Sequence, residues 1–279
     1  MRCARHSSHA GKSSERYISQ LFVGRLGAMW NPNDLTTLYA TEAGTTRIAG
    51  DGATIGLVKA KLGNAHAASQ STAGARPTYK TTPNRLVYGT DDALLFGAIF
   101  NDILAGVDSQ FSIVACVNGV SQSASSFFLF TKYGDASHGE NQREVCLGFY
   151  SGKIELTTYI NGGLTGPYRI SDSTSAIGTG KRVVTSTYDG STDGNGGLDR
   201  FKFWIDGISD TAVMAFTAGA IGDIYAGTAQ SAFGGSVGSA GTPVFYDYTA
   251  DIGPILLING VLSASEIAQI NNYFMEIWL

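Results

Sequence analysis

The sequence has few cysteines, few prolines and few charged residues. Only three of its 279 residues are cysteine: Cys3, Cys116 and Cys146. Such a sparse, odd count forms no disulfide framework, which excludes a small disulfide-stabilised scaffold and is typical of a reducing compartment. We expect Cys116 and Cys146, which lie in strand-like segments, to be buried free thiols.

Several functional classes lack their sequence signals. No apolar run is long enough to span a membrane, and the N-terminus has no apolar centre of the signal-peptide kind. The net charge of −4 argues against a dedicated nucleic-acid-binding protein. No nucleophile elbow, phosphate loop or dinucleotide fingerprint occurs, and the histidines pair with no cysteine at zinc spacing. We therefore predict no nucleic-acid or membrane partner and no cofactor.

Glycine and apolar residues are abundant instead. Thirty-six glycines, 43% apolar residues and only 15% charged residues fit short strands joined by glycine-rich turns better than a helical bundle. About ten to twelve strand-like segments with such turns predict a single β-sandwich. The clearest of these segments span residues 111–117, 126–133, 144–150, 153–160, 181–188, 198–205 and 252–258.

The end of the chain predicts a buried strand, a turn and an amphipathic helix. Asn259-Gly260 is a tight-turn pair, and Ser263 with Glu266 forms a capping box that begins a helix. Behind it, apolar residues from Ile267 onward recur at helical spacing. A helix of this length cannot bury its apolar stripe alone, so we expect it to lie on the sandwich.

A second, short helix is predicted near the start of the sandwich. Asn31 suits the N-cap and Pro32 the first helical position, with Leu38 on the buried side and Gly44 at the end.

Residues 1–28 differ in charge from the rest of the chain. Five basic residues stand there against Glu15 alone, a net charge of +4, so the remainder carries −8. A basic arm on an acidic body predicts a segment that docks on a partner, although a solvated terminus has the same composition. We predict an extended arm over residues 1–28 and one domain over residues 29–279. The candidate docking residues of the arm are Arg2, Arg5, Lys12, Arg16 and Arg25.

Catalytic carboxylates are poorly represented. A glycan hydrolase on a jelly-roll fold needs two or three carboxylates at alternate positions of one strand, so that both face the sugar. The nearest stretch is Glu140-Asn141-Gln142-Arg143-Glu144, with Gln142 where the central acid is needed. We therefore predict that the protein is not an enzyme.

Two acidic clusters can be interpreted in two ways. Asp91-Asp92 and the group around Asp189, Asp193 and Asp199 offer oxygen ligands of the kind that calcium prefers. The same residue types dominate turns for conformational reasons, and neither cluster matches an EF-hand loop. We favour turns, with calcium as the alternative.

Aromatic residues on strands are candidate sugar contacts. Exposed rings stack on sugars while nearby polar groups bind hydroxyls. Trp204 lies on the strand face opposite Phe201 and Phe203, where core packing is the other interpretation. We select Trp204, Tyr188 and Asp189 as candidate ligand-binding residues. Other candidates are Tyr159, Tyr168, Tyr246 and Tyr248.

From Trp30 onward the chain resembles the concanavalin A-like, or laminin-G-like, jelly-roll domains. The closing stretch ADIGPILLINGVLSASEIAQINNYF is similar to their last core strand and helix start. RVVTSTYDG with RFKFWIDGISD is similar to their paired strands and turn. MWNPNDLTTLYA and LVYGTDDALLF resemble a subset found in phage and prophage particle proteins, although Val87-Tyr88-Gly89 replaces the Phe-Asp-Gly usual in that subset.

The resemblance implies an all-β concanavalin A-like jelly-roll β-sandwich and a non-enzymatic phage virion structural protein. Such a capsid decoration, fibre or tail component would be made in the host cytoplasm and lie in the virion. Its partners would be other virion subunits bound through the arm, and it would form a homo-oligomer. The alternatives are a lectin-like module that attaches to a host surface glycan and, less favoured, a divergent glycan hydrolase.

Overall fold

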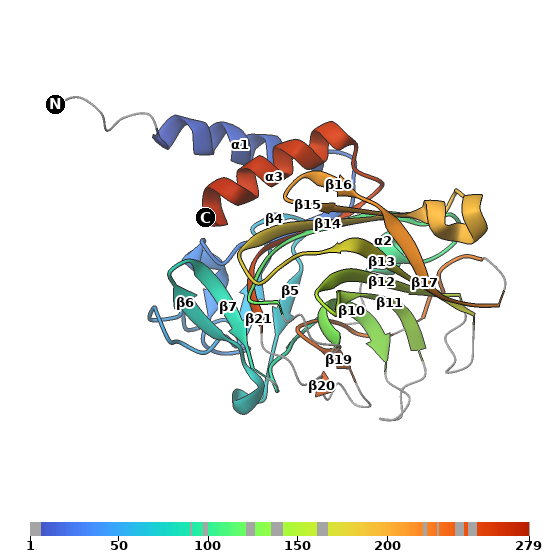
Figure 1. Ribbon diagram of the computed structural model, residues 1–279. Helices are drawn as coiled ribbons and strands as arrows, with labels where there is room; N and C mark the ends of the chain where they lie inside the picture. Colours follow the sequence, from blue (N-terminus) through green and yellow to red (C-terminus); the bar gives the residue numbers. More distant parts are fainter. Residues whose placement is uncertain are drawn as a thin grey trace.

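A computed structural model describes residues 7–89, 91–96, 100–120, 126–134, 142–160, 167–219, 222–227, 229–237, 243–244 and 250–278. Within them, 21 strands form two sheets that pack face to face, with one long helix near each end of the chain (Figure 1). The prediction of an all-β sandwich with a C-terminal helix is confirmed. None of the described helices combines the length and the apolarity needed to span a membrane.

The first sheet, sheet A, has nine strands. Its main path runs β16-β15-β14-β9-β21-β1-β4, and β7 joins the edge of β21 and carries β6. The central strand β21 pairs antiparallel with β9, β1 and β7. The strands of sheet A are β1 (Gly27–Trp30), β4 (Leu62–Gly63), β6 (Thr78–Thr81), β7 (Asn84–Tyr88), β9 (Gln110–Asn118), β14 (Arg182–Asp189), β15 (Phe201–Ile205), β16 (Ile208–Asp210) and β21 (Ala250–Asn259).

The second sheet, sheet B, has twelve strands. Its main path runs β17-β13-β12-β11-β10-β18-β8-β5-β3-β2; off this path, β19 pairs with β10, and β20 pairs with β19. These strands are β2 (Leu38–Tyr39), β3 (Leu57–Lys59), β5 (Ala67–Ser69), β8 (Leu94–Leu95), β10 (Ser126–Gly134), β11 (Gln142–Tyr150), β12 (Lys153–Tyr159), β13 (Tyr168–Ala176), β17 (Ala212–Ala218), β18 (Ser231–Phe233), β19 (Ser236–Val237) and β20 (Pro243–Val244). The remaining elements are α1 (Ser7–Leu21), α2 (Asn101–Leu104), α3 (Ala264–Trp278), η1 (Leu35–Thr37), η2 (Ala73–Ala75) and η4 (Gly194–Arg200).

Apolar side chains fill two separate layers. The main core lies between the sheets, and Trp30 is an aromatic centre of it, in edge contact with Phe96, Phe100 and Phe233. The second core lies between sheet A and the two long helices. Cys116 belongs to this second core and Cys146 to a smaller cluster on sheet B, both as buried free thiols as expected.

Helix α3 begins as the capping box predicts. Glu266 accepts a hydrogen bond from the Ser263 backbone N–H at 2.7 Å, and Ser263 Oγ accepts one from the Glu266 N–H at 3.3 Å. Ile267, Ile270 and Phe274 are then buried against sheet A. Figure 1 shows α3 lying over β14 and β15, with α1 beside it.

The N-terminal segment differs from the predicted extended arm. Residues from Ser7 form α1, and its Ile18 and Leu21 are buried in the second core. Their spacing of three residues places both on one helix face, and α3 supplies the apolar surface that covers them. Strand β1 begins at Gly27, two residues before the predicted start of the sandwich domain.

The helix predicted to begin at Asn31 is replaced by a single 3-10 turn, η1. The Asn31 side chain accepts a hydrogen bond from the Asn33 N–H at 2.9 Å, which makes a local turn instead of a helix cap. Asp34 caps η1 through the Thr36 N–H, and Leu38 then enters β2.

Gly253 tests the contact between α3 and sheet A. A Cβ atom at Gly253 would lie 2.5 Å from the Trp278 ring and 2.9 Å from Cys116 Cβ. We expect Gly253→Ala to lower the free energy of unfolding by about 1–3 kcal/mol, because a packed layer does not admit an extra methyl group. Gly74→Ala is the control, because nothing lies within 4 Å of its Cβ position. Equal urea midpoints for the two variants would contradict this packing.

Candidate functional site

The candidate site lies on the outer face of sheet B. Along β12, Ile154 and Leu156 enter the main core, so Glu155 and Tyr159, at alternating positions, lie on the opposite face. The two long helices cover the outer face of sheet A, whereas no described helix is part of the cluster on sheet B.

Aromatic rings from four strands form a row that spans this face from β10 to β17. We call it the aromatic row: Phe128 and Tyr133 of β10, Tyr159 of β12, Tyr168 of β13 and Phe216 of β17. Its rings are in contact from one end to the other, with centroids 6.5, 5.7, 5.4 and 4.9 Å apart in that order. Three of the four contacts are stacked.

Exposure rises from Tyr133 to Phe216. Tyr133 and Tyr159 are buried, Tyr168 is half-buried and Phe216 is 47% exposed. Strand β17 is the edge of sheet B, so Phe216 ends the row. An exposed ring supported from behind by a stacked ring is a preformed apolar platform.

Arg143 adds a positive charge at the buried end. Its guanidinium carbon lies 4.9 Å from the Tyr133 ring centre and 5.8 Å from that of Tyr159. The guanidinium group is therefore held on the aromatic rings by cation–π attraction.

Two carboxylates lie further along the same face. Glu155 of β12 and Asp172 of β13 are directly paired across the two strands, and Glu155 is also paired with Gly148 of β11. Directly opposite residues share a face, with Cβ atoms about 4.5–5.5 Å apart. Burial, followed by the charge of Asp172, raises the pKa of Glu155 to about 7. Burial also raises the pKa of Asp172, and Lys153 partly offsets this effect.

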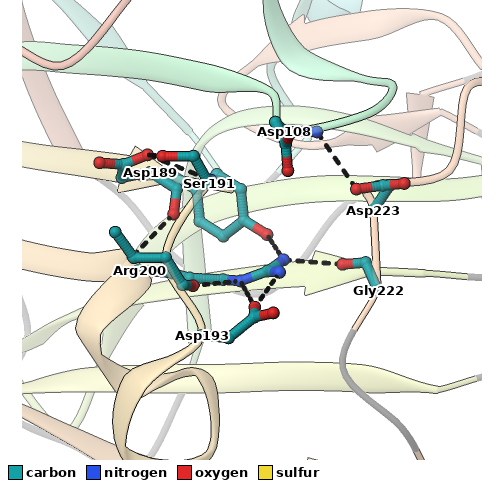
Figure 2. Close-up of polar contacts among 9 residues, drawn as sticks. Asp108, Asp189, Ser191, Asp193, Arg200, Gly222 and Asp223 are labelled. Carbon is teal, nitrogen blue, oxygen red and sulfur yellow. Dashed lines mark hydrogen bonds and ion pairs between the residues drawn. The ribbon is translucent and has the colours of Figure 1, made fainter.

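Tyr188, a predicted ligand residue, is buried and contacts Arg200. Figure 2 shows Arg200 at the centre of a polar cluster. Arg200 donates to Tyr188 Oη at 2.9 Å, to the Gly222 carbonyl at 2.8 Å and to the Thr192 carbonyl at 2.8 Å, and it pairs with Asp193. Tyr188 also stacks on Phe111 with ring centres 5.3 Å apart. The structure therefore uses Tyr188 to join η4 and β14, and its ring has no exposed face for a sugar.

Asp189, the second predicted residue, organises a turn. It accepts hydrogen bonds from Gln110 Nε2 at 2.7 Å, Ser191 Oγ at 2.6 Å and the Ser191 N–H at 3.1 Å. Burial raises its pKa, but these hydrogen bonds outweigh burial and hold the pKa below its usual value. The carboxylate is thus occupied by its own turn and by Gln110 of β9, and the turn contacts are those that turn chemistry predicts.

Trp204, the third predicted residue, is covered by α3. It is 9% exposed and belongs to the second core with Val183 and Ile270. The structure therefore places Trp204 in core packing and leaves its ring little surface for a sugar. Of the other aromatic candidates, Tyr159 and Tyr168 lie in the aromatic row, whereas Tyr246 and Tyr248 lie outside the described residues.

The predicted carboxylates of a glycan hydrolase are not on an open surface. Glu144 is fully buried and pairs with the equally buried Lys132. Glu140 lies outside the described residues. The structure therefore gives no support to this pair as acid and nucleophile facing a sugar.

The acidic clusters are used in local hydrogen bonds. Asp92 accepts from the Gly89 N–H at 2.7 Å, and Asp199 accepts from Asn195 at 2.6 Å. In the described part of the chain, no group of three or more His, Cys, Asp or Glu side chains is placed to hold a metal ion. A shallow hollow of about 590 Å³ lies beside η4, lined by residues that include Leu198, Phe201 and Lys202.

The basic residues of the predicted arm have different environments. Arg25 pairs with Glu266 of α3 at 2.9 Å, so this residue docks within its own chain. Arg16 is exposed on α1, and Lys12 lies in the same helix. Arg2 and Arg5 lie outside the described residues, so docking of this arm on a partner stays a prediction.

The Glu155–Asp172 pair was missed because the two residues are 17 positions apart and meet only through strand pairing. The alternation in KIELTTY does place Glu155 and Tyr159 on one face, so the sequence alone allowed the position of Glu155 to be predicted. The polar segment of β13 gave no strand signal from which Asp172 could be found.

No protein-family model matches the sequence, and no curated protein matches it. Solved structures do match the fold. The binding domain of Paraclostridial Mosquitocidal Protein 1 superposes with a TM-score of 0.55 at 11% identity, over 79% of this chain and 52% of that chain. The binding domain of botulinum neurotoxin serotype G gives 0.54 at 10% identity, over 78% and 48%.

A third similar structure is Trypanosoma rangeli sialidase in complex with 2,3-difluoro-KDN. It superposes with a TM-score of 0.51 at 13% identity, over 96% of this chain and 38% of the sialidase. The chain therefore spans about half or less of the length of these structures. At such identities the likeness establishes the fold alone, a two-layer β-sandwich.

The position of Trp204 generates a stability prediction. We expect Trp204→Ala to lower the free energy of unfolding by about 3–5 kcal/mol, because it leaves a cavity beneath α3. Urea denaturation followed by circular dichroism measures this loss. A Trp204→Ala protein as stable as the wild type would show that α3 does not cover this position.

The raised pKa of Glu155 predicts a pH-dependent stability. Between its ordinary value of 4.5 and about 7, the folded protein holds a proton that the unfolded chain has lost. Stability therefore falls as pH rises through this window. Glu155→Gln removes the carboxyl group that binds this proton. We therefore expect the free energy of unfolding of the variant, relative to that of the wild type, to be about 1–3 kcal/mol higher at pH 8 than at pH 4.

Urea titrations at both pH values measure that difference. The exposed Glu42 provides the control, because Glu42→Gln removes a carboxylate from the surface without removing a buried one. A constant difference between Glu155→Gln and the wild type at pH 4 and pH 8 would contradict the assignment.

Proposed function

We propose that this protein is a non-enzymatic carbohydrate-binding module whose ligand surface is the outer face of sheet B. The observation that carries the proposal is the aromatic row, which ends in the exposed Phe216. Aromatic platforms beside a few polar groups are the usual composition of sites that bind amphipathic ligands such as sugars.

The arrangement of polar groups supports the same function. Arg143, Glu155 and Lys153 lie on sheet B at or beside the aromatic row, so apolar rings and hydrogen-bonding groups share one surface. Sugar rings present apolar C–H faces and hydroxyl edges, which match such a surface. Similar folds occur in structures described as toxin binding domains, and this is consistent with attachment as a role.

Glycan hydrolysis is the second candidate function, and one observation favours it. Glu155 and Asp172 are paired carboxylates with raised pKa values, and such pairs serve as acid and base in glycosidases. Incubation with neutral oligosaccharides and chromatography of the products separates the two functions. Released sugar that disappears in Glu155→Gln would make the protein an enzyme.

The virion role remains a prediction that rests on sequence resemblance. Attachment to a host surface glycan is compatible with a place in a virion, and the carbohydrate-binding proposal does not require it. Formation of a homo-oligomer and binding to other virion subunits are likewise predictions from the sequence resemblance.

Phe216 provides the direct test of the proposed function. We expect Phe216→Ala to weaken glycan binding about tenfold or more, because it removes both the apolar area that the ring buries and a stacking contribution of about 0.5–1.5 kcal/mol. A glycan array followed by calorimetry on the best ligand measures this effect. Ile208→Ala is the matched control, because Ile208 is an exposed apolar residue on sheet A. If no glycan binds the wild type, or if both variants bind equally well, the aromatic row is not the ligand surface.

A further inference from the structure

Glu155 and Asp172 are in one cross-strand row of the outer face. Gly148 of β11 lies on one side of Glu155, and Val213 of β17 lies on the far side of Asp172. Gly148 contributes no side chain to this row, and Phe128 of β10, which pairs with Gly148, is the next residue along it. The pair is therefore bordered by a glycine on one side and a small apolar residue on the other.

Asp172 has an unsatisfied acceptor at this place. The residue is only 9% exposed, and its Oδ1 is buried without a hydrogen-bond partner. Among the described residues, no hydrogen-bond donor or ion-pair partner reaches the carboxylate of Glu155 either. A buried acceptor without a donor costs about 1–3 kcal/mol, so this site favours any molecule that brings donors to it.

The charges around the pair decide which ligand charge this site accepts. Lys153 lies two positions before Glu155 on β12, and its positive charge partly offsets the rise that burial causes in the pKa of Asp172. Burial raises the pKa of the Cys146 thiol of β11, and Cys146 lies close enough to Glu155 for the charge of that carboxylate to raise it further. Arg143 lies elsewhere on the face, against Tyr133 and Tyr159. Two carboxylates against one lysine leave this end of the face negative.

The distance from the pair to the aromatic row differs along the row. Phe128 lies in the same cross-strand row, because it pairs with Gly148. Tyr159 is farther away, four residues from Glu155 on β12, or about 13 Å. A carbohydrate that contacts both Glu155 and Tyr159 is therefore an oligosaccharide.

We propose that Glu155 and Asp172 are the specificity residues of the aromatic face and select neutral oligosaccharides over those that end in a carboxylate. This inference rests on the proposed function. Sugar hydroxyls donate hydrogen bonds to Glu155 and to the part of Asp172 that is exposed, whereas a sugar carboxylate can only accept and is repelled. Discrimination of this kind combines an attraction to the right ligand with a repulsion of the wrong one.

The test uses pairs of glycans that differ only in charge. N-acetyllactosamine oligomers are compared on an array with the same oligomers capped by sialic acid, and the affinities are then measured by calorimetry at pH 8. We expect the cap to weaken binding about tenfold or more, because a charge-assisted hydrogen bond is replaced by repulsion.

Isosteric variants assign the effect to the pair. Glu155→Gln and Asp172→Asn keep the shape and remove one charge each, so we expect neutral oligomers to bind about tenfold more weakly and the capped and uncapped oligomers to approach each other within about threefold. Asp199→Asn, on the exposed η4 turn, is the control for loss of one negative charge. Thermal melting confirms that each variant is folded.

The outcomes separate the inference from the function on which it rests. If capped oligomers bind the wild type as well as or better than uncapped ones, the inference is overturned, and loss of that binding in Arg143→Gln would assign the ligand carboxylate to Arg143. If the variants retain the discrimination of the wild type, the inference is likewise overturned. If neither capped nor uncapped oligomers nor any other glycan on the array binds, the proposed function itself fails.

Discussion

Burial of the apolar side of α3 against sheet A is the interaction on which the rest of the structure depends. Four of its side chains, Ile267, Ile270, Phe274 and Trp278, are almost completely buried. Each such side chain stabilises the fold by about 1.5–3 kcal/mol relative to exposure, so together they approach the net stability of a typical domain. Without this helix, the outer face of the central strands β9, β14 and β21 would be open to water.

The same layer decides which face of the sandwich is free for a ligand. Helix α3 covers Trp204 and Val183, and α1 extends the cover with Ile18. The outer face of sheet B has no comparable helix among the described elements, and it carries the aromatic row. The outer face of sheet A is therefore buried under helices and stabilises the fold. The outer face of sheet B is the one available for binding, because the long helices pack on the other sheet.

Polar groups in two parts of the molecule also differ in whether their hydrogen bonds are satisfied within the chain. Around Arg200, nearly all donors are used to hold η4 and the Gly222 segment onto β14, so this cluster stabilises a loop. On the outer face of sheet B, Asp172 Oδ1 has no partner. Similar residue types thus have opposite roles, because one cluster is satisfied within the chain and the other is not.

Local patterns in the sequence were sufficient to predict the strands of the core, the capping box at Ser263 and the burial of both strand cysteines. These features depend on neighbouring residues and on alternation, which a sequence displays directly. Local rules failed at residues 7–21 and at Asn31. The apolar stripe of α1 is stabilised by α3, more than 240 residues away, and Asn31 makes a side-chain turn where a helix cap was expected.

The sequence by itself therefore determined the class of fold and the identity of its last strand and helix. Only the tertiary structure decided which aromatic residues are exposed, because Trp204 and Phe216 both lie on strands, but α3 covers Trp204 whereas Phe216 is 47% exposed at the edge of sheet B. It also brought Glu155 and Asp172 together, since cross-strand pairing depends on the register of β12 and β13 and not on distance along the chain.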